Sequence, residues 1–291
     1  MLLRKRSFLF TVNLALLVIL LIVSLIVVLP LNWDYYVLST SEYGHRDLYS
    51  QGSSWITSIE SLRDLDAVRT VLVVARNSPL DSGELEGIIE FTNRGGIVIT
   101  YGSRELTESV FRYLGFKATY EGLIRDPVFS WSSSIKVLVE LPLCNNTIVV
   151  LDTPYLFNIT GTWIIGDLLY TINTSMFSFL DKNNNKLYDV DELLGEFPVI
   201  YIVKVGRGLI IIVCAHGVFT NSVFNGNTPW LECLTNRSRS VVVDQSEFKS
   251  DLLACFKLLV FTSRGVSPLF VLVVSLTILV ILYRVYSYKG S

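Results

Sequence analysis

The sequence predicts an α/β protein with a doubly wound parallel sheet, a β-rich insertion and a membrane-spanning helix on either side. Strand and helix patterns alternate through the first half of the central segment, residues 32–265, as they do in parallel sheets. Two uncharged apolar runs flank that segment. Between residues 116 and 198 the alternation stops, and Ser, Thr, Asn and aromatic residues become more frequent. We interpret this stretch as an insertion rich in strands and loops.

Each apolar run is long enough to span a membrane. Residues 7–29 and 266–283 carry no charge, and helices of such length cross about 30 Å of hydrocarbon. A helix that packs on the core of a soluble domain would show a polar face, and neither run has one. A cleaved signal peptide is the alternative for the first run. However, that run is longer than the apolar region of a signal, and no small-residue cleavage site follows it. We therefore expect an uncleaved anchor.

Flanking charge orients the two runs. Cytoplasmic flanks carry an excess of Lys and Arg, so we expect the tails 1–6 and 284–291 in the cytoplasm and the central segment outside. The sequence thus predicts a two-pass protein of the cell membrane, in contact with the lipid bilayer. The net charge of -2 and the lack of a basic stripe argue against a nucleic-acid partner. The basic residues that set the orientation are Arg4, Lys5, Arg6, Arg284 and Lys289.

Four N-x-S/T sequons agree with this topology, because all of them lie between the apolar runs. Such sequons accept glycans on the outer side of a membrane. The predicted acceptors are Asn145, Asn158, Asn173 and Asn236.

The four cysteines also lie in the central segment, where an oxidising environment allows disulfides. Four cysteines permit three pairings. We predict Cys233–Cys255, because both flank one short strand-to-helix unit. Cys214 ends an apolar strand and is expected to be a buried thiol.

The first elements of the central segment follow from local patterns. Residues 35–40 (YYVLST) are expected to form a strand, and residues 53–62 (SSWITSIESL) a short helix. Residues 70–75 (TVLVVA) are a continuous run of mainly β-branched residues, which indicates a strand buried on both faces.

A second strand–helix unit follows. Ser82 is expected to cap a helix with Glu84 in its first turn, where negative charge is favoured, and Gly95-Gly96 ends it. Residues 97–101 (IVITY) predict the next strand, and residues 104–115 predict a helix closed by glycine.

The last elements follow the insertion. Residues 199–215 are expected to form two strands joined at Gly206-Arg207-Gly208. Residues 240–245 (SVVVDQ) predict a last strand, and residues 247–261 a last helix that leads directly into the second apolar run.

Several of these stretches resemble one membrane-anchored, mainly archaeal family of unknown function. They are "SPLDSGELEGIIEFTNRGGIVITYGS", "SVFRYLGF", "KVGRGLIIIVCAHGVFTNSVFNGN" and "RSVVVDQSEF". Members carry a degenerate domain similar to the class I glutamine-amidotransferase fold. The resemblance implies a flavodoxin-like sandwich and supplies no established reaction. Members often show Glu and His after the Asp of the last motif, whereas Gln245, Ser246 and Glu247 follow Asp244 here. This departure weakens a catalytic role.

Two catalytic arrangements can be considered. True amidotransferases use a Cys nucleophile at a strand-to-helix elbow, and Ser103 stands at the equivalent place, where a helix N-cap explains it as well. Cys214 and His216 lie two apart on a strand and so share a face, which permits a thiolate–imidazole contact. No motif places an acid behind the histidine. We therefore predict no catalytic residue and no cofactor other than a candidate calcium ion.

The stretch DKNNNKLYDVDEL fills the oxygen-ligand positions of a calcium loop. Lys186 stands where such loops need glycine for a sharp turn, which argues against calcium. A solvated turn built from Asn and Asp is the alternative. The candidate ligands are Asp181, Asn183, Asn185, Leu187 through its carbonyl, Asp189 and Glu192.

These features together predict a non-enzymatic domain that binds or organises an envelope or membrane protein at the outer face of the membrane. One alternative is a hydrolase or transferase that uses Ser103, or Cys214 with His216. Another is calcium-dependent surface adhesion through residues 181–192.

Overall fold

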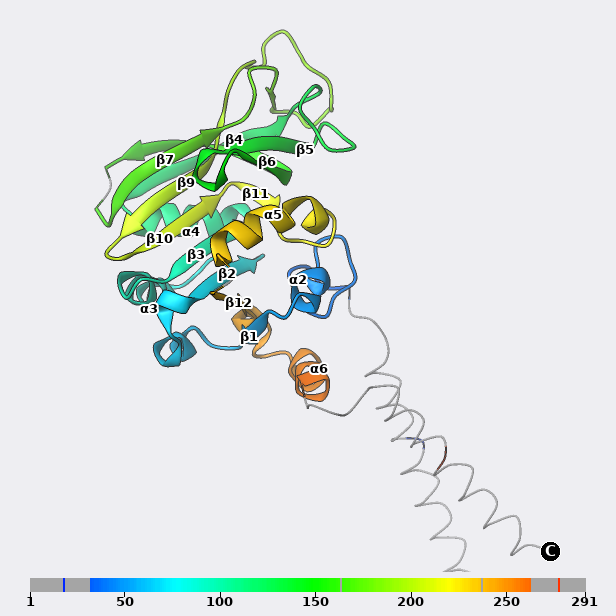
Figure 1. Ribbon diagram of the computed structural model, residues 1–291. Helices are drawn as coiled ribbons and strands as arrows, with labels where there is room; N and C mark the ends of the chain where they lie inside the picture. The colour runs from blue at the N-terminus through cyan, green and yellow to red at the C-terminus, as the bar shows by residue number, and fades with distance from the viewer. Residues whose placement is uncertain (1–17, 19–31, 163, 237, 263–276, 278–291) are drawn as a thin grey trace, which may run out of the picture. The chain divides into compact units, whose positions relative to one another are not determined.

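The computed structural model describes residues 18, 32–162, 164–236, 238–262 and 277 (Figure 1). Contacts divide the chain into two units: residues 32–249, and residues 1–31 together with 250–291. Of the latter unit we describe the helix α6 (Leu252–Thr262), whose first turn is capped by the Asp251 carboxylate.

Among the described residues, no helix combines the length and the apolar character that a membrane crossing requires. Apart from Val18 and Thr277, the predicted spans 7–29 and 266–283 lie outside the described residues.

The unit 32–249 is built on a seven-stranded sheet with the order β1-β12-β2-β3-β10-β9-β7 (Figure 1). The first five strands in this order are parallel to one another, whereas β9 is antiparallel to both of its neighbours, β10 and β7. The predicted parallel α/β arrangement is therefore confirmed for the centre of the sheet. The strands are β1 (Ser54–Ile56), β2 (Thr70–Arg76), β3 (Ile97–Gly102), β7 (Asp167–Asn173), β9 (Pro198–Val205), β10 (Gly208–Val213) and β12 (Ser240–Asp244).

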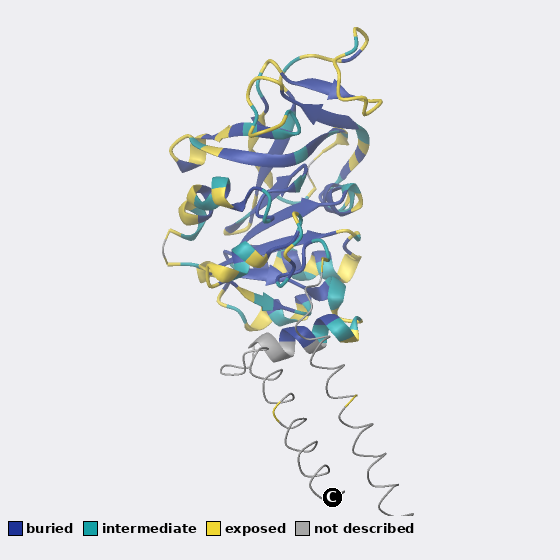
Figure 2. Cartoon of the chain, turned by 90° about the vertical axis from the view of Figure 1, so that its right-hand side faces the viewer, coloured by how far each residue is buried: buried dark blue, intermediate teal, exposed yellow. Residues whose placement is uncertain are grey.

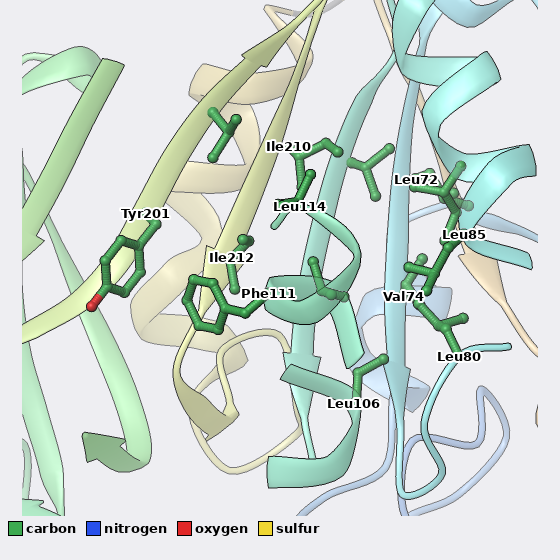
Figure 3. Packing of buried hydrophobic residues seen from close by; sticks show 14 of the residues in the cluster. Leu72, Val74, Leu80, Leu85, Leu106, Phe111, Leu114, Tyr201, Ile210 and Ile212 are labelled. Carbon is green, nitrogen blue, oxygen red and sulfur yellow. The ribbon is translucent and has the colours of Figure 1, made fainter. Parts of the chain in front are cut away.

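Helices cover both faces of this sheet. The helices α3 (Ser82–Asn93) and α4 (Arg104–Tyr113) share one apolar core with the strands (Figure 3). Because side chains alternate along a strand, Tyr101 of β3 points to the opposite face from its neighbours Val98 and Thr100. There its ring meets Phe219, which packs on Trp230 of α5 (Phe224–Thr235). The sequence patterns did not predict α5.

A second, antiparallel sheet contains most of the predicted insertion. Its strand order is β11-β6-β4-β8, and β5 also pairs with β6. The insertion is not a separate body, because β7 adds to the first sheet and β4 packs on α4 in the common core. Figure 2 shows buried strands with exposed loops at their ends. The strands are β4 (Phe116–Arg125), β5 (Lys136–Leu141), β6 (Thr147–Gly161), β8 (Phe179–Asp181) and β11 (Ala215–Gly217).

Short elements complete the unit. They are α2 (Arg46–Ser50) and the 3₁₀ turns η1 (Ile59–Asp64), η2 (Ala67–Arg69), η3 (Pro142–Cys144) and η4 (Ser246–Phe248).

The strand predicted at residues 35–40 is wrong, because this stretch forms turns. Tyr35 adopts a left-handed conformation with φ 59°. Its carbonyl contacts the side chains of His45 and Gln245, each at 2.9 Å. Side chains therefore satisfy a backbone group that a sheet ladder would otherwise use.

Two predicted helices also differ from the structure. Residues 53–62 form β1 and then η1, since Trp55 and its neighbours pair with β12 and Ser58 caps the 3₁₀ turn. Residues 247–261 divide into η4 and α6, separated by residues 249–251. The helix α3 is capped by Asp81, one residue before the predicted cap Ser82.

The predicted disulfide Cys233–Cys255 is wrong, because Cys233 bonds to Cys144 with an S–S distance of 2.01 Å. Cys233 lies on α5, which packs on η3 and on β6. Cys144 ends η3 and therefore faces it, whereas Cys255 belongs to α6.

Candidate functional site

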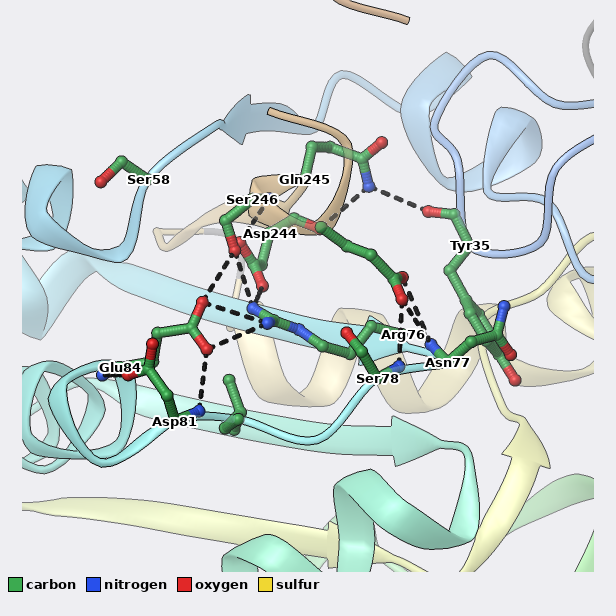
Figure 4. Close-up of polar contacts among 12 residues, drawn as sticks. Tyr35, Ser58, Arg76, Asn77, Ser78, Asp81, Glu84, Asp244, Gln245 and Ser246 are labelled. Carbon is green, nitrogen blue, oxygen red and sulfur yellow. Dashed lines mark hydrogen bonds and ion pairs between the residues drawn. The ribbon is translucent and has the colours of Figure 1, made fainter. Parts of the chain in front are cut away.

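Folds with parallel strands commonly hold ligands at the carboxyl edge, where neighbouring strands connect in opposite directions. In this sheet that place lies between β2 and β12. From β2 the chain continues to β3, which lies on one side of β2 in the sheet. The strand β12, which comes much later in the sequence, lies on the other side of β2. The loops after β2 and β12 and the first turn of α3 surround this edge (Figure 4).

A buried arginine fills this edge. Arg76 ends β2 and is 3 % exposed. One terminal nitrogen donates to both carboxylate oxygens of Glu84 at 3.1 Å. The other donates to Asp244 at 2.5 Å and to the Ser246 hydroxyl at 2.7 Å. We call these four residues the arginine quartet.

The charged groups of the quartet stabilise one another. Burial disfavours the Arg76 cation, but Asp244 and Glu84 outweigh that effect and raise the pKa of the guanidinium above its usual value. Glu84 has a second structural role, because it forms a capping box with Asp81 at the start of α3.

A carboxylate also occupies the loop after β2. Glu247 accepts hydrogen bonds from the backbone N–H groups of Asn77, at 3.2 Å, and Ser78, at 3.0 Å. Adjacent N–H groups of this kind bind the anionic groups of ligands in many proteins. Here both are bonded within the chain, so the edge between β2 and β12 is filled by the protein's own side chains.

A second buried network lies under the neighbouring strand β3. The hydroxyl of Tyr101 and the Nε2 atom of His45 lie 2.6 Å apart, and Nδ1 of His45 contacts the Tyr35 carbonyl. Burial lowers the pKa of His45 to about 4, although the bond to Tyr35 opposes this shift. At neutral pH His45 is therefore an uncharged, fully bonded core residue.

The candidate nucleophiles are not brought together with a base. The Ser103 hydroxyl accepts from the Leu106 N–H at 3.1 Å, which makes it the N-cap of α4. Cys214 is fully buried in the core, and burial raises the pKa of its thiol. No hydrogen bond between the described residues joins His216 to either side chain.

His216 is half-buried beside a cation that the sequence patterns did not indicate. Burial lowers the pKa of the imidazole, and Arg104 lowers it further, against the carboxylates of Asp152, Glu105 and Asp34. The guanidinium of Arg104 lies 3.7 Å above the centre of the Tyr120 ring. Stacking on an aromatic ring holds the cation in place.

A buried dipeptide, Arg125-Asp126, lies at the end of β4 and holds the exposed loops around it. Asp126 accepts from the backbone of Val128 and Phe129 with one oxygen, and from the hydroxyls of Ser175 and Ser178 with the other. One carboxylate therefore ties the β4–β5 loop to the β7–β8 loop.

Arg125 ties a third loop to the same place. Its Nε donates to Asp181, and a terminal nitrogen donates to Asn184 at 2.9 Å, which fixes the start of the β8–β9 loop. Burial opposes ionisation of Asp181. However, the bond from Arg125 and the N–H of Lys186 outweigh burial and lower the pKa of Asp181.

Large apolar side chains project from these three fixed loops, and they are between 45 % and 97 % exposed. Phe129 and Phe177 stack across two of the loops with their centres 6.1 Å apart. Contiguous exposed apolar side chains mark interaction sites, and this stacked pair is such a contact. We call them the loop surface: Val128, Phe129, Trp131, Met176, Phe177, Leu187, Tyr188, Val190, Leu193 and Leu194.

The predicted calcium loop forms part of the third loop. Lys186 adopts a left-handed conformation with φ 70°, at the position that usually needs glycine. Its N–H and that of Asn185 donate to Asp181, each at 3.1 Å. The chain thus makes the sharp turn of such a loop without glycine.

The oxygens of this loop are nevertheless already bonded. Asp189 accepts from the amide groups of Asn183 and Asn185, each at 2.8 Å. Glu192 accepts from the backbone of Lys182 and Asp189. Within the described chain, no group of three or more His, Cys, Asp or Glu side chains is arranged to hold a metal ion. Calcium in this loop, with Leu187 as its carbonyl ligand, stays a prediction.

All four predicted glycan acceptors are exposed: Asn145, Asn158, Asn173 and Asn236.

Comparisons with known proteins include distant likenesses to solved structures. No family model and no curated protein matches the chain. The mmIFT52 N-terminal domain is 11% identical, with a TM-score of 0.42, over 61% of this chain and 80% of that chain. A putative ThuA-like protein from Bacteroides uniformis ATCC 8492 is 14% identical, with a TM-score of 0.32, over 73% and 76%. An exo-beta-1,4-mannosidase from Opitutaceae bacterium strain TAV5 is 9% identical, with a TM-score of 0.28, over 50% and 20%. At these values the likenesses carry no functional argument.

Proposed function

We propose that this chain is a non-catalytic binding and assembly domain with a flavodoxin-like core, anchored in the cell membrane by two spans. It holds an envelope or membrane protein through the loop surface. The observation that carries the proposal is the buried dipeptide Arg125-Asp126, which fixes three loops that expose apolar side chains. Fixing a binding surface before the partner arrives reduces the conformational entropy lost on binding.

The composition of the loop surface favours a protein partner. Aromatic residues and Met are enriched where proteins bind one another, and this surface includes Phe129, Trp131, Met176, Phe177 and Tyr188.

Placement outside the membrane has independent support. The disulfide Cys144–Cys233 is typical of oxidising compartments. The exposed sequon asparagines are accessible to a glycosylating enzyme. The resemblance to the membrane-anchored, mainly archaeal family agrees with the same location.

The hydrolase or transferase alternative has less support. Ser103 is engaged as a helix cap and Cys214 lies in the core, so neither is available beside His216. The carboxyl edge between β2 and β12, where a substrate would be expected, is filled by the arginine quartet.

The test is crosslinked affinity purification of the full-length protein from native membranes. We compare the wild type with a Phe129→Ser, Phe177→Ser double variant, and use Val68→Ser as the control, since Val68 is 56% exposed on η2 away from these loops. A partner recovered with the wild type and the control should be lost with the double variant. Aromatic contact residues commonly contribute about 2 kcal/mol each. Equal recovery with all three proteins would rule out the loop surface as the binding site.

A further inference from the structure

The strand β7 is an open edge of the seven-stranded sheet. Within the described part of the chain it pairs with β9 only. Its residues from Asp167 to Thr171 are exposed, and Ile172 is the buried one. Leu168, Leu169 and Tyr170 are 39 %, 44 % and 47 % exposed. Edge strands of soluble proteins are usually protected by Lys, Pro, bulges or a covering segment. The sequence of β7 contains neither Lys nor Pro, and its pairing with β9 shifts register between Leu168 and Tyr170 and between Ile172 and Asn173.

An apolar groove of about 520 Å³ adjoins this edge. Leu168 of β7 forms part of its wall, together with Phe116, Leu193, Pro198 and Tyr201. Neighbouring strands lie about 4.8 Å apart with their side chains on common faces. A strand added to β7 would therefore carry alternate side chains alongside Leu168 and over the groove.

One charge stands in this apolar wall. Glu121 is the extra residue of a bulge in β4, since Tyr120 pairs with Phe157 while Gly122 pairs with Leu156. Bulges re-aim side chains, and Glu121 is the only charged residue among the described residues that line the groove. In the described residues, no ion pair or side-chain hydrogen bond engages it.

We propose that β7 receives an extended segment of a protein partner as an additional strand. The segment has an apolar side chain that enters the groove and a lysine or arginine that pairs with Glu121. Main-chain hydrogen bonds along β7 supply affinity, while the groove and the carboxylate supply specificity. The proposal rests on the proposed function, because it names how part of the partner binds.

The proposal also concerns two sequons. Asn158 lines the groove and Asn173 ends β7, so a glycan on either would cover the site. The native protein should therefore carry glycans on Asn145 or Asn236 and leave the other two bare. Intact glycopeptide mass spectrometry of protein from native membranes measures this. A glycan on Asn158 or Asn173 would overturn the proposal.

The binding test uses a display pool of random peptides of about eight residues, enough to pair along β7, selected on the full chain in lipid nanodiscs. Enriched peptides should have apolar residues at every second position and contain Lys or Arg. When bound, they should protect the backbone amides of β7 from hydrogen exchange. Leu168→Lys should lower the affinity for these peptides at least tenfold. Glu121→Gln should lower it about threefold, as expected for the loss of a partly exposed ion pair. The control Ile148→Lys, at another exposed strand residue, should bind as the wild type does.

Two further outcomes would overturn the proposal. One is enrichment of no peptide, or of peptides that Leu168→Lys binds equally well. The other is pairing of β7 with a second copy of this chain, seen as a dimer that Leu168→Lys dissociates. The Phe129→Ser, Phe177→Ser variant should still bind the selected peptides. The loop surface and the β7 edge can therefore fail separately.

Discussion

Removing the arginine of the quartet should destabilise the fold more than removing one of its carboxylates. Arg76 forms an ion pair with both Asp244 and Glu84. Arg76→Met would leave two carboxylates without a counter-charge, with side chains 1% and 18% exposed. Asp244→Asn keeps the shape of the side chain and leaves Arg76 paired with Glu84.

The expected magnitudes follow from burial. Removing one partner of a buried ion pair costs about 3–5 kcal/mol, because a charge stays buried and uncompensated, and we expect this for Arg76→Met. Replacing a charge-assisted hydrogen bond by a neutral one costs about 1–2 kcal/mol, and we expect this for Asp244→Asn. In the Arg76→Met background, Asp244→Asn should cost nothing or restore stability, since it removes one of the two unpaired charges.

Denaturant unfolding followed by tryptophan fluorescence measures these effects, and the chain offers five tryptophans. The four proteins of the double-mutant cycle are compared at equal detergent concentration. The reasoning is refuted if Asp244→Asn destabilises more than Arg76→Met. Additive effects of the two substitutions would also refute it, because a shared counter-charge requires coupling.

Three other predictions concern His45, the disulfide and the loop at Asp181. Burial lowers the pKa of His45 to about 4, below its unfolded value. Because the unfolded state then binds a proton that the folded state does not, the free energy of unfolding should fall by about 3 kcal/mol as the pH drops from 6.5 to 4. His45→Gln should flatten that slope in melting curves recorded across this pH range. Cys144→Ser opens a loop of 89 residues closed by Cys233 and should cost about 4 kcal/mol, measured as a lower denaturation midpoint, whereas reductant should not shift the midpoint of this variant. If the loop at Asp181 binds calcium, chelator should lower the melting temperature of the wild type and leave Asp189→Ala unchanged; equal curves with and without chelator would reject the metal.

The central strands could be predicted from sequence because their signal is local. Residues 70–75 and 97–101 are continuous apolar runs, and both are strands in the structure. Residues 35–40 have a similar composition but form turns, because bonds from His45 and Gln245 decide their backbone. Gln245 lies 210 residues from Tyr35 in the chain, and a partner at that distance leaves no trace in a local pattern.

The residues of the candidate site were the least predictable. The sequence marks the acidic stretch from Asp181 but gives no sign that Arg125 occupies its first carboxylate. Asp126 likewise has no motif, since its partners lie in two loops about fifty residues apart. An Arg-Asp pair at the end of a strand is too common to be informative alone. The same holds for the disulfide, where proximity in sequence favoured Cys255 over the correct partner.

Two buried arginines end strands and have opposite consequences for ligand access. Arg76 closes the carboxyl edge of the parallel sheet, where folds of this class usually bind small molecules. Arg125, with Asp126, fixes the loops of the insertion so that apolar side chains stay exposed. Exposed apolar area is costly unless a partner covers it. On the proposed function, binding has therefore moved from the crevice of the sheet to the insertion, and substitutions in the arginine quartet should change stability without changing the choice of partner.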